Sequence, residues 1–141
     1  AINEDTDIDI VTDFSYYQVV QDLDGGVYSL EAHSMTHMVH LELYTDPTAT
    51  KIPAGEYILS TTKAPGTALI SSGVVDGQNN GCYASTLDTI RGFLRDLWFM
   101  TGGKVILSYD EYDRVKLHID ATNSYNRESH IDIAYIFHHA H

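Results

Sequence analysis

Three segments between residues 102 and 136 alternate apolar and polar residues, and this alternation limits the possible folds more than any other feature of the chain. The apolar positions are Val105, Leu107 and Tyr109, then Val115, Leu117 and Ile119, then Ile131, Ile133 and Tyr135. A period of two is typical of strands with one face in a core and the other in water. The residues between them, 110–114 and 121–128, favour turns. The sequence therefore predicts a three-stranded antiparallel meander with one solvated face.

Short strands are also predicted upstream, at residues 14–21, 27–33, 37–44, 57–60 and 67–75, with Gly, Pro or Asp near most junctions. Residues 76–81 predict a loop. Two interpretations of residues 86–100 stay open, because the apolar spacing fits a helical face at 86–97 while residues 96–100 also fit a buried strand. We expect an all-β protein, an antiparallel β-sandwich or alternatively a flattened β-barrel, with at most one short helix near 86–97.

The register of the last two strands follows from matching their apolar faces. Pairing about Tyr125 sets His118 opposite Asp132 and Asp120 opposite His130. The same pairing brings two apolar pairs into register, Leu117 with Ile133 and Ile119 with Ile131. In the hairpin of residues 27–44, the equivalent alignment sets Glu31 opposite His40 and Leu30 opposite Leu41. The pattern thus predicts three cross-strand pairs of histidine with carboxylate.

Histidine and carboxylate are also the ligands of zinc and related cations, which makes His118, Asp120, His130 and Asp132 the candidate metal ligands. The two pairs lie diagonally on a pleated surface, where each cross-strand pair contributes only about 0.2–1 kcal/mol. We therefore expect ordinary pairing, no metal site and no cofactor. Residues 138–141 contain three more histidines and are expected to form a flexible tail.

Catalytic motifs are absent from the sequence. It contains no Gly-x-Ser-x-Gly, phosphate loop, His-Glu-x-x-His or dinucleotide fingerprint, and Cys82 is its only cysteine. Asp110, Glu111 and Asp113 could act as the carboxylates of a hydrolase, but acidic groups on one turn are usually solvated. We expect a protein without enzymatic activity. A small hydrolase that uses the acidic turns or the His–Asp pairs is the alternative.

Aromatic residues supply the candidate ligand-binding positions. The chain has 10 tyrosines, and exposed aromatic rings bind sugars or peptide side chains. Tyr112 and Tyr125 fall in predicted turns, where no core requires them, and Tyr83 follows the predicted loop at 76–81. These three tyrosines are the predicted contact residues for a glycan, a peptide or a partner protein.

Length and charge limit the partners further. At 141 residues the chain predicts one domain at 10–137, preceded by an acidic tether at 1–9 and followed by the His-rich tail at 138–141. Its formal net charge of −12 opposes binding to nucleic acid or anionic lipid, which recruit clustered Lys and Arg. We expect neutral or cationic partners.

The order of several short motifs resembles that of known proteins. Leu43-Tyr44 precedes Ile52-Pro53-Ala54-Gly55-Glu56-Tyr57, and Gly102-Gly103-Lys104-Val105 opens the meander. Over residues 26–136 this order is similar to small β-sandwich domains of surface lipoproteins from gut Bacteroidales, an uncharacterised family. The chain departs from the pattern at Asn123-Ser124, where Asn-Gly is usual, and at residues 86–100.

The resemblance implies export, a lipid anchor at a cysteine ahead of Ala1, and a place on the outer-membrane surface beside a nutrient-uptake complex. It implies no catalytic residues. Our first hypothesis is a non-catalytic lipoprotein domain that binds a glycan, a peptide or a partner protein. The hydrolase is the second hypothesis, and a structural subunit of a surface assembly is the third.

Overall fold

The computed structural model describes residues 8–10, 16–21, 26–33, 37–49, 51–71, 74–75, 78–88, 93–124 and 128–134. Its strands are β1 (Ile8–Ile10), β2 (Tyr16–Gln21), β3 (Val27–His33), β4 (His37–Tyr44), β5 (Gly55–Ser60), β6 (Thr67–Leu69), β7 (Val74–Val75), β8 (Gln78–Asn79), β9 (Tyr83–Asp88), β10 (Phe93–Tyr109), β11 (Val115–Asn123) and β12 (Glu128–Ala134). None of the described residues is helical, so the predicted all-β class is confirmed. Among them there is accordingly no helix with the length and hydropathy needed to span a bilayer.

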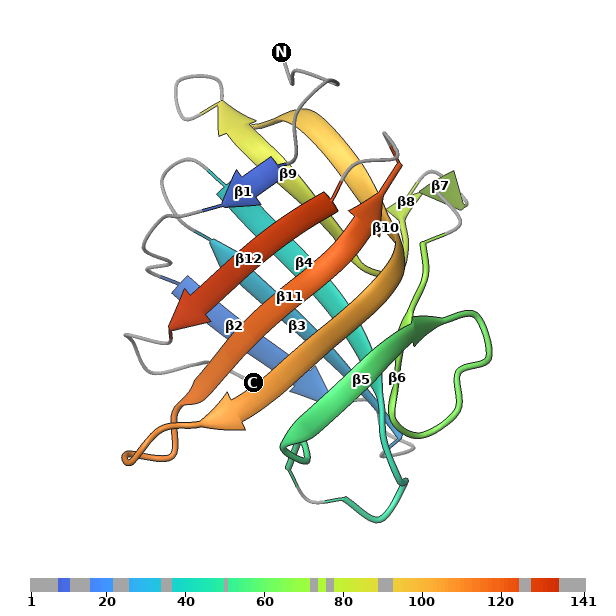
Figure 1. Ribbon diagram of the computed structural model, residues 1–141, viewed down its shortest axis with the longest axis vertical. Coiled ribbons are helices and arrows are strands. Elements are labelled where there is room, and N and C mark those ends of the chain that lie inside the picture. The colour runs from blue at the N-terminus through green and yellow to red at the C-terminus, as the bar shows by residue number, and fades with distance from the viewer. Residues whose placement is uncertain are drawn as a thin grey trace.

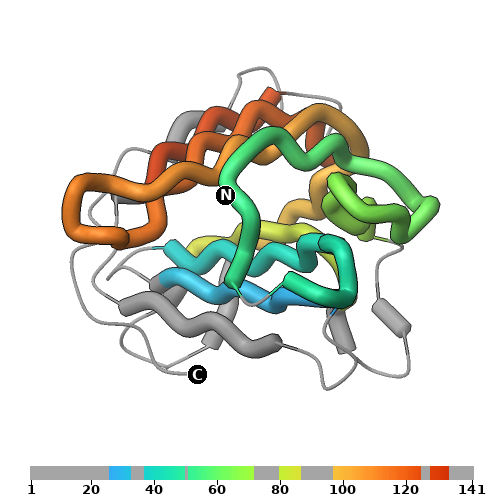
Figure 2. Tube along the Cα trace, turned by 90° about the horizontal axis from the view of Figure 1, so that it is seen from below, coloured from blue at the N-terminus to red at the C-terminus, as the bar shows by residue number. Residues whose placement is uncertain are grey.

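Ten of the strands form one sheet that closes on itself. Its hydrogen-bonded order is β1-β12-β11-β10-β5-β6-β4-β3-β2, and β9 joins β10 to β4. The ring of β4, β9, β10, β5 and β6 is a small barrel, which agrees with the alternative fold expected from the sequence. The remaining strands extend it into two layers, so that β10, β11 and β12 lie over β3, β4 and β9 (Figure 2). Most pairings are antiparallel, but β5 with β6 and β1 with β12 are parallel.

The long strand β10 belongs to both layers (Figure 1). Its first half, up to Phe99, pairs with β9, whereas Lys104 to Leu107 pair with β5. Between these halves the register against β11 shifts at Met100 and Gly102, and Gly103 has a φ of 111°. The sequence places Gly102-Gly103 ahead of a strand, but the pair lies inside one. The strand bends at this bulge, where Gly103 adopts a backbone conformation that residues other than glycine rarely adopt.

The core lies between the two layers and, among the residues whose burial is described, consists mainly of inward positions of β3, β4, β5, β6, β9, β10, β11 and β12. In β4, for example, Val39, Leu41 and Leu43 are buried, and the intervening His40 and Glu42 are half-exposed. The largest fully buried side chains are Trp98, Leu30, Leu41, Leu43, Met100, Leu107, Ile119, Ile131, Val39, Val105 and Asn123. Burial of apolar side chains is the dominant favourable term in folding, so this shared interior holds the layers together.

The sequence leaves open whether residues 86–97 form a helix or strands. Wherever the structure describes this segment, it is strand. Tyr83–Asp88 forms β9, and β10 begins at Phe93. The two strands pair antiparallel, with Trp98 opposite Ala84 and both side chains buried. Residues 89–92 lie outside the described part of the chain. A spacing that suits a helical face therefore belongs to two strands whose inward positions line the barrel.

The hairpin of β11 and β12 is longer than the alternation predicts. Residues 121–128 were expected to form a solvated turn, but Ala121 pairs with Ser129 and Thr122 with Glu128. Asn123 and Ser129 are both fully buried, and the Asn123 amide donates a hydrogen bond to the Ser129 hydroxyl at 2.9 Å. The expectation was wrong because two polar residues that bond to each other can enter a core at little cost.

Three tyrosines fasten the loop that leads into β5. Tyr57 donates its hydroxyl hydrogen to the Pro53 carbonyl at 2.5 Å, and Tyr109 donates to the Ile52 carbonyl at 2.6 Å. Tyr28 reaches the carbonyl of Ala49 at 3.4 Å. The Ile-Pro-x-Gly-x-Tyr motif thus closes on itself, and its tyrosine holds the loop ahead of β5 in place at one end of the barrel.

Several predictions fall wholly or partly outside the described residues. They concern Tyr125, Tyr135, the His-rich tail at 138–141 and the first seven residues of the expected tether. Of that tether the structure describes Ile8 and Asp9, which belong to β1.

Candidate functional site: a histidine–carboxylate chain and an exposed hairpin tip

The register of β11 and β12 brings four of the predicted residues together on the outer face. His118 lies opposite Asp132, and Asp120 lies opposite His130. The predicted apolar pairs, Leu117 with Ile133 and Ile119 with Ile131, are also in register, and all four of their side chains are buried. The cross-strand alignment derived from the sequence is therefore confirmed for this hairpin.

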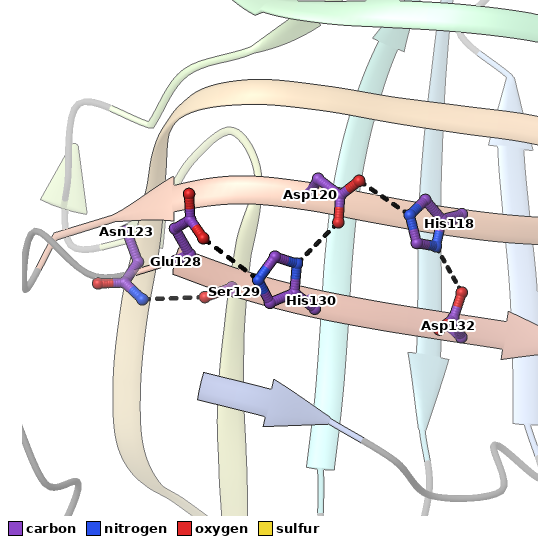
Figure 3. A network of polar contacts seen from close by, with 7 residues as sticks. All are labelled: His118, Asp120, Asn123, Glu128, Ser129, His130 and Asp132. Atoms are coloured by element: carbon purple, nitrogen blue, oxygen red, sulfur yellow. Dashed lines mark hydrogen bonds and ion pairs between the residues drawn. The ribbon is translucent and has the colours of Figure 1, made fainter. Parts of the chain in front are cut away.

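The side chains form a continuous chain rather than separate pairs (Figure 3). His118 contacts Asp132 through Nδ1 at 2.5 Å and Asp120 through Nε2 at 2.9 Å. Asp120 also contacts Nδ1 of His130 at 2.8 Å, and Nε2 of His130 lies 3.4 Å from a carboxylate oxygen of Glu128. The order is carboxylate, imidazole, carboxylate, imidazole, carboxylate. Each histidine therefore has a carboxylate at both ring nitrogens.

This arrangement favours the doubly protonated form of both imidazoles. A neutral imidazole has one N–H donor and one lone pair, so it can donate to only one of two carboxylates. The hydrogen bonds to Asp132 and then Asp120 raise the pKa of His118 above its ordinary value, against the effect of desolvation. The hydrogen bond from His130, opposed by desolvation and aided by the hydrogen bond from His118, holds the pKa of Asp120 below its ordinary value.

The same geometry bears on the candidate metal ligands. Each imidazole nitrogen faces a carboxylate oxygen, whereas a metal site requires several lone pairs aimed at one point. Within the described ranges, no group of three or more His, Cys, Asp or Glu residues is arranged to hold a metal ion. The four residues are thus brought together, but as hydrogen-bonded partners.

The histidine–carboxylate chain is solvated along its length. The exposed fraction of its side chains runs from 36% for Asp120 to 78% for Asp132. Ion pairs with this exposure contribute about 0–1 kcal/mol each, because water screens the charges and the side chains lose freedom. Beside the His118 end is a depression of about 370 Å³, lined also by Ile106 and Lys116. The histidine–carboxylate chain therefore sets the charge of the outer face near His118 and His130 but contributes only modestly to the stability of the fold.

The tip between β10 and β11 is a second candidate surface, and Asp110 fixes its shape. One Asp110 carboxylate oxygen accepts the backbone N–H groups of Tyr112 and Arg114 at 2.8 and 2.9 Å. The other accepts Nε of Arg114 at 2.7 Å. Desolvation raises the pKa of Asp110, but these hydrogen bonds and the Arg114 charge outweigh it and hold the pKa below its ordinary value. The carboxylate is thus committed to organising the turn.

Tyr112 projects from this fixed tip. Its exposed fraction is 70%, and it and Ile58, at 48%, are the exposed large apolar side chains among the described residues. The Arg114 guanidinium lies 4.9 Å from the centroid of the Tyr112 ring. At the base of the tip, Lys51 pairs with Asp113 at 3.2 Å and lies over the ring of Tyr109. An aromatic side chain is therefore presented to solvent on a preorganised support.

Tyr83 is placed differently. Its ring stacks on His40, with centroids 4.9 Å apart and an interplanar angle of 20°, and Phe99 meets it edge-on at 6.3 Å. Burial, followed by the charges of Glu31 and Glu42, raises the pKa of Tyr83. One ring face is thus used by a neighbouring strand, and the residue offers less of its surface to a ligand than Tyr112 does.

The third predicted pair, Glu31 with His40, is in register as expected. In addition, Nδ1 of His40 lies 2.9 Å from the carbonyl oxygen of Gly81, and the Gly81 N–H donates to Glu42 at 3.2 Å. His40 and Glu42 in β4 therefore bind the backbone of Gly81, which precedes β9, whereas the sequence pattern predicts only the side-chain pair of Glu31 with His40.

Sequence reasoning missed three participants. Glu128 extends the histidine–carboxylate chain, and its position two residues before His130 could have revealed it, because such residues share a strand face. Arg114 is adjacent to the acidic turn in the sequence, so its contact with Tyr112 was also within reach. Lys51 is not predictable in this way, since its partner Asp113 is 62 residues away.

Comparisons with protein-family models, curated proteins and solved structures gave no match to this chain.

Proposed function

We propose that the chain is a non-catalytic, lipid-anchored domain of the outer-membrane surface that binds a glycan, a peptide or a partner protein as an accessory subunit of a nutrient-uptake complex. The motif order of residues 26–136 supports the cellular location. The contact surface is the β10–β11 tip, with Tyr112 as the anchoring side chain.

The exposure of the Tyr112 ring is the observation that carries the binding role. An aromatic side chain with 70% exposure gains nothing from the core, and a ligand that covers it recovers its apolar area. Tyrosine and arginine are enriched among the residues that dominate binding energy, and here they are adjacent. The hydrogen bonds of Asp110 fix the tip before binding, which lowers the entropy lost when a complex forms.

The non-catalytic role is supported by the state of the acidic turn. General acid catalysis by a carboxyl group requires a raised pKa, so that the proton is present near neutral pH. Asp110 has a lowered pKa and both of its carboxylate oxygens accept hydrogen bonds. Glu111 and Asp113 are exposed at the same turn.

The test is a comparison of Tyr112→Ala with the parent protein, first on an array of soluble glycans and then in co-purification from native membranes. Loss of an anchoring side chain typically costs about 2 kcal/mol or more, or roughly thirty-fold in affinity. We expect the Tyr112→Ala signal to fall by at least that factor, with no change in thermal unfolding.

Ile58→Ala provides the matched control, because Ile58 is the other exposed large apolar side chain and lies in β5, away from the tip. It should bind as the parent does. Equal binding by Tyr112→Ala and the parent, or a loss caused by both variants, would reject the tip as the contact surface.

A further inference from the structure

We infer that the histidine–carboxylate chain is a pH-dependent clamp on the β12 edge of the sheet. It holds β12 to β11 most firmly while His118 and His130 each carry two ring protons, and it weakens when they lose one. This role is independent of the proposed binding function.

The geometry gives the clamp its direction. Two of the four contacts cross between β11 and β12, and both use Nδ1 of an imidazole: His118 with Asp132 and His130 with Asp120. The other two join neighbours on one strand, His118 with Asp120 and His130 with Glu128. When an imidazole is neutral, one ring nitrogen turns a lone pair toward a carboxylate oxygen. The nitrogen with the lone pair then repels its carboxylate, and the hydrogen bond that remains loses the charge of the imidazolium and becomes weaker. Both histidines change in the same sense, because each lies between two carboxylates.

The location makes the edge sensitive to this change. On its other side β12 is covered by β1 alone among the described strands, and the pairing spans only Ile8 to Ile10 against Ser129 to Ile131. Three parallel residues contribute little to holding an edge. The attachment of β12 therefore depends on its ladder with β11, on its buried isoleucines, and on the clamp.

Four other charged groups lie near the clamp. On this face they are Lys104 in β10 opposite Asp120, Lys116 in β11, Glu56 in β5 and, by backbone register alone, Asp9 in β1 opposite His130. Carboxylates and lysines ordinarily titrate below pH 5 or above pH 10, roughly, so the imidazoles are the groups that change between about pH 6 and 8.

The sign follows from the directions of the shifts. A histidine whose pKa is raised in the folded protein stabilises it below the ordinary histidine pKa, and this stabilisation is lost as the pH rises through the folded value. Asp120, whose pKa is lowered, stabilises above the ordinary carboxyl range and loses its effect in acid. The clamp is thus strongest at mildly acidic pH and weaker above neutrality.

The experiment measures amide hydrogen exchange of β12 by NMR from about pH 5.5 to 8.5, after correction for the intrinsic exchange rate. Protection of β12 in the parent protein should fall across this range, by about ten-fold for each unit by which the His118 pKa differs between the closed and opened states. In the double variant His118→Gln with His130→Gln the corrected protection should not change with pH. His40→Gln, which removes a histidine outside the clamp, should behave as the parent does.

Imidazole NMR provides a second measurement on the intact protein. The His118 pKa should lie above its ordinary value of 6.5, and Asp132→Asn should lower it. Corrected protection of β12 that does not vary with pH in the parent, or a His118 pKa at or below 6.5, would overturn the inference. Asp132→Asn gives the same test should the double variant fail to fold.

Discussion

Tyr57 donates its hydroxyl hydrogen to the backbone carbonyl of Pro53 at 2.5 Å, so the last residue of the Ile-Pro-x-Gly-x-Tyr motif closes on its second. The exposed fraction of Tyr57 is only 3%, and its ring is part of the core cluster. A carbonyl in a loop ahead of a strand has no ladder partner, and the hydroxyl supplies one. The motif is therefore a structural lock that positions the start of β5.

Removal of this hydroxyl should lower stability without opening a cavity. We expect Tyr57→Phe to reduce the free energy of unfolding by about 1–2 kcal/mol, because the ring stays packed while the Pro53 carbonyl loses its donor. Tyr112→Phe is the control, since Tyr112 is exposed, and should change stability by less than about 0.5 kcal/mol. Urea unfolding of the two variants and the parent measures the difference; equal midpoints for all three would contradict the lock.

The same tyrosine predicts sensitivity to alkali. Desolvation, followed by the charges of Tyr109 and Tyr28, raises the pKa of Tyr57 from 10.0 to about 12. A raised pKa means that the unfolded state loses its proton first, so stability is intact below pH 10 and declines as the pH rises toward 12. The decline should be about 1.4 kcal/mol at pH 11 and approach about 2–3 kcal/mol only above pH 12. Denaturant unfolding at pH 9, 10 and 11 should reveal it in the parent and a smaller decline in Tyr57→Phe.

Two adjacent glycines should differ sharply in their tolerance of alanine. At Gly103, where φ is 111°, a Cβ would lie 2.2 Å from the Asp120 carbonyl oxygen and 2.7 Å from Cα of Ala121. Both are backbone atoms, so the clash cannot be relieved by a rotamer, and Gly103→Ala should cost about 3 kcal/mol or more. At Gly102 no atom lies within 4 Å of the added Cβ, so Gly102→Ala should stay within about 1 kcal/mol of the parent.

Thermal unfolding of the two alanine variants checks this prediction directly. Similar losses at both positions would mean that β10 does not bend around Gly103 as described.

Zinc should bind weakly and without involving the clamp. The ring nitrogens of His118 and His130 face carboxylate oxygens instead of converging on one point. Calorimetric titration of zinc into the parent and into His130→Ala should therefore give the same small heats. A tight site in the parent that is lost in His130→Ala would show that these side chains rearrange around a cation.

Much of the β-structure was predictable from local pattern. The bounds of β3 and β4 match the predicted segments 27–33 and 37–44, and the registers of two hairpins followed from apolar matching. Alternation predicts the register here because a slip of one residue would move every apolar side chain of a strand to the face exposed to water. The pairing of His118 with Asp132 was available for the same reason.

Other features depended on contacts that pattern cannot contain. Asn123 looks like a turn residue, but it is buried because Ser129 on the next strand satisfies its amide. The spacing of apolar residues at 86–97 fits a helical face, but this segment forms strands because β9 pairs with β4 as well as with β10. Lys51 reaches Asp113 only because the tyrosine-fastened loop brings residue 51 to the base of the tip.

Three features depend on alternation along one strand or across one hairpin and could therefore be derived without a structure. They are the all-β class, the solvated face of the meander and the opposition of histidines to carboxylates. Three further features required the folded structure. The sheet closes through β9, β10, β5, β6 and β4, the His–carboxylate pairs join into one chain ending at Glu128, and Tyr112 is exposed while Tyr83 is stacked on His40. Closure and ring exposure are set by which distant strands share a core, and that depends on the packing of the whole chain.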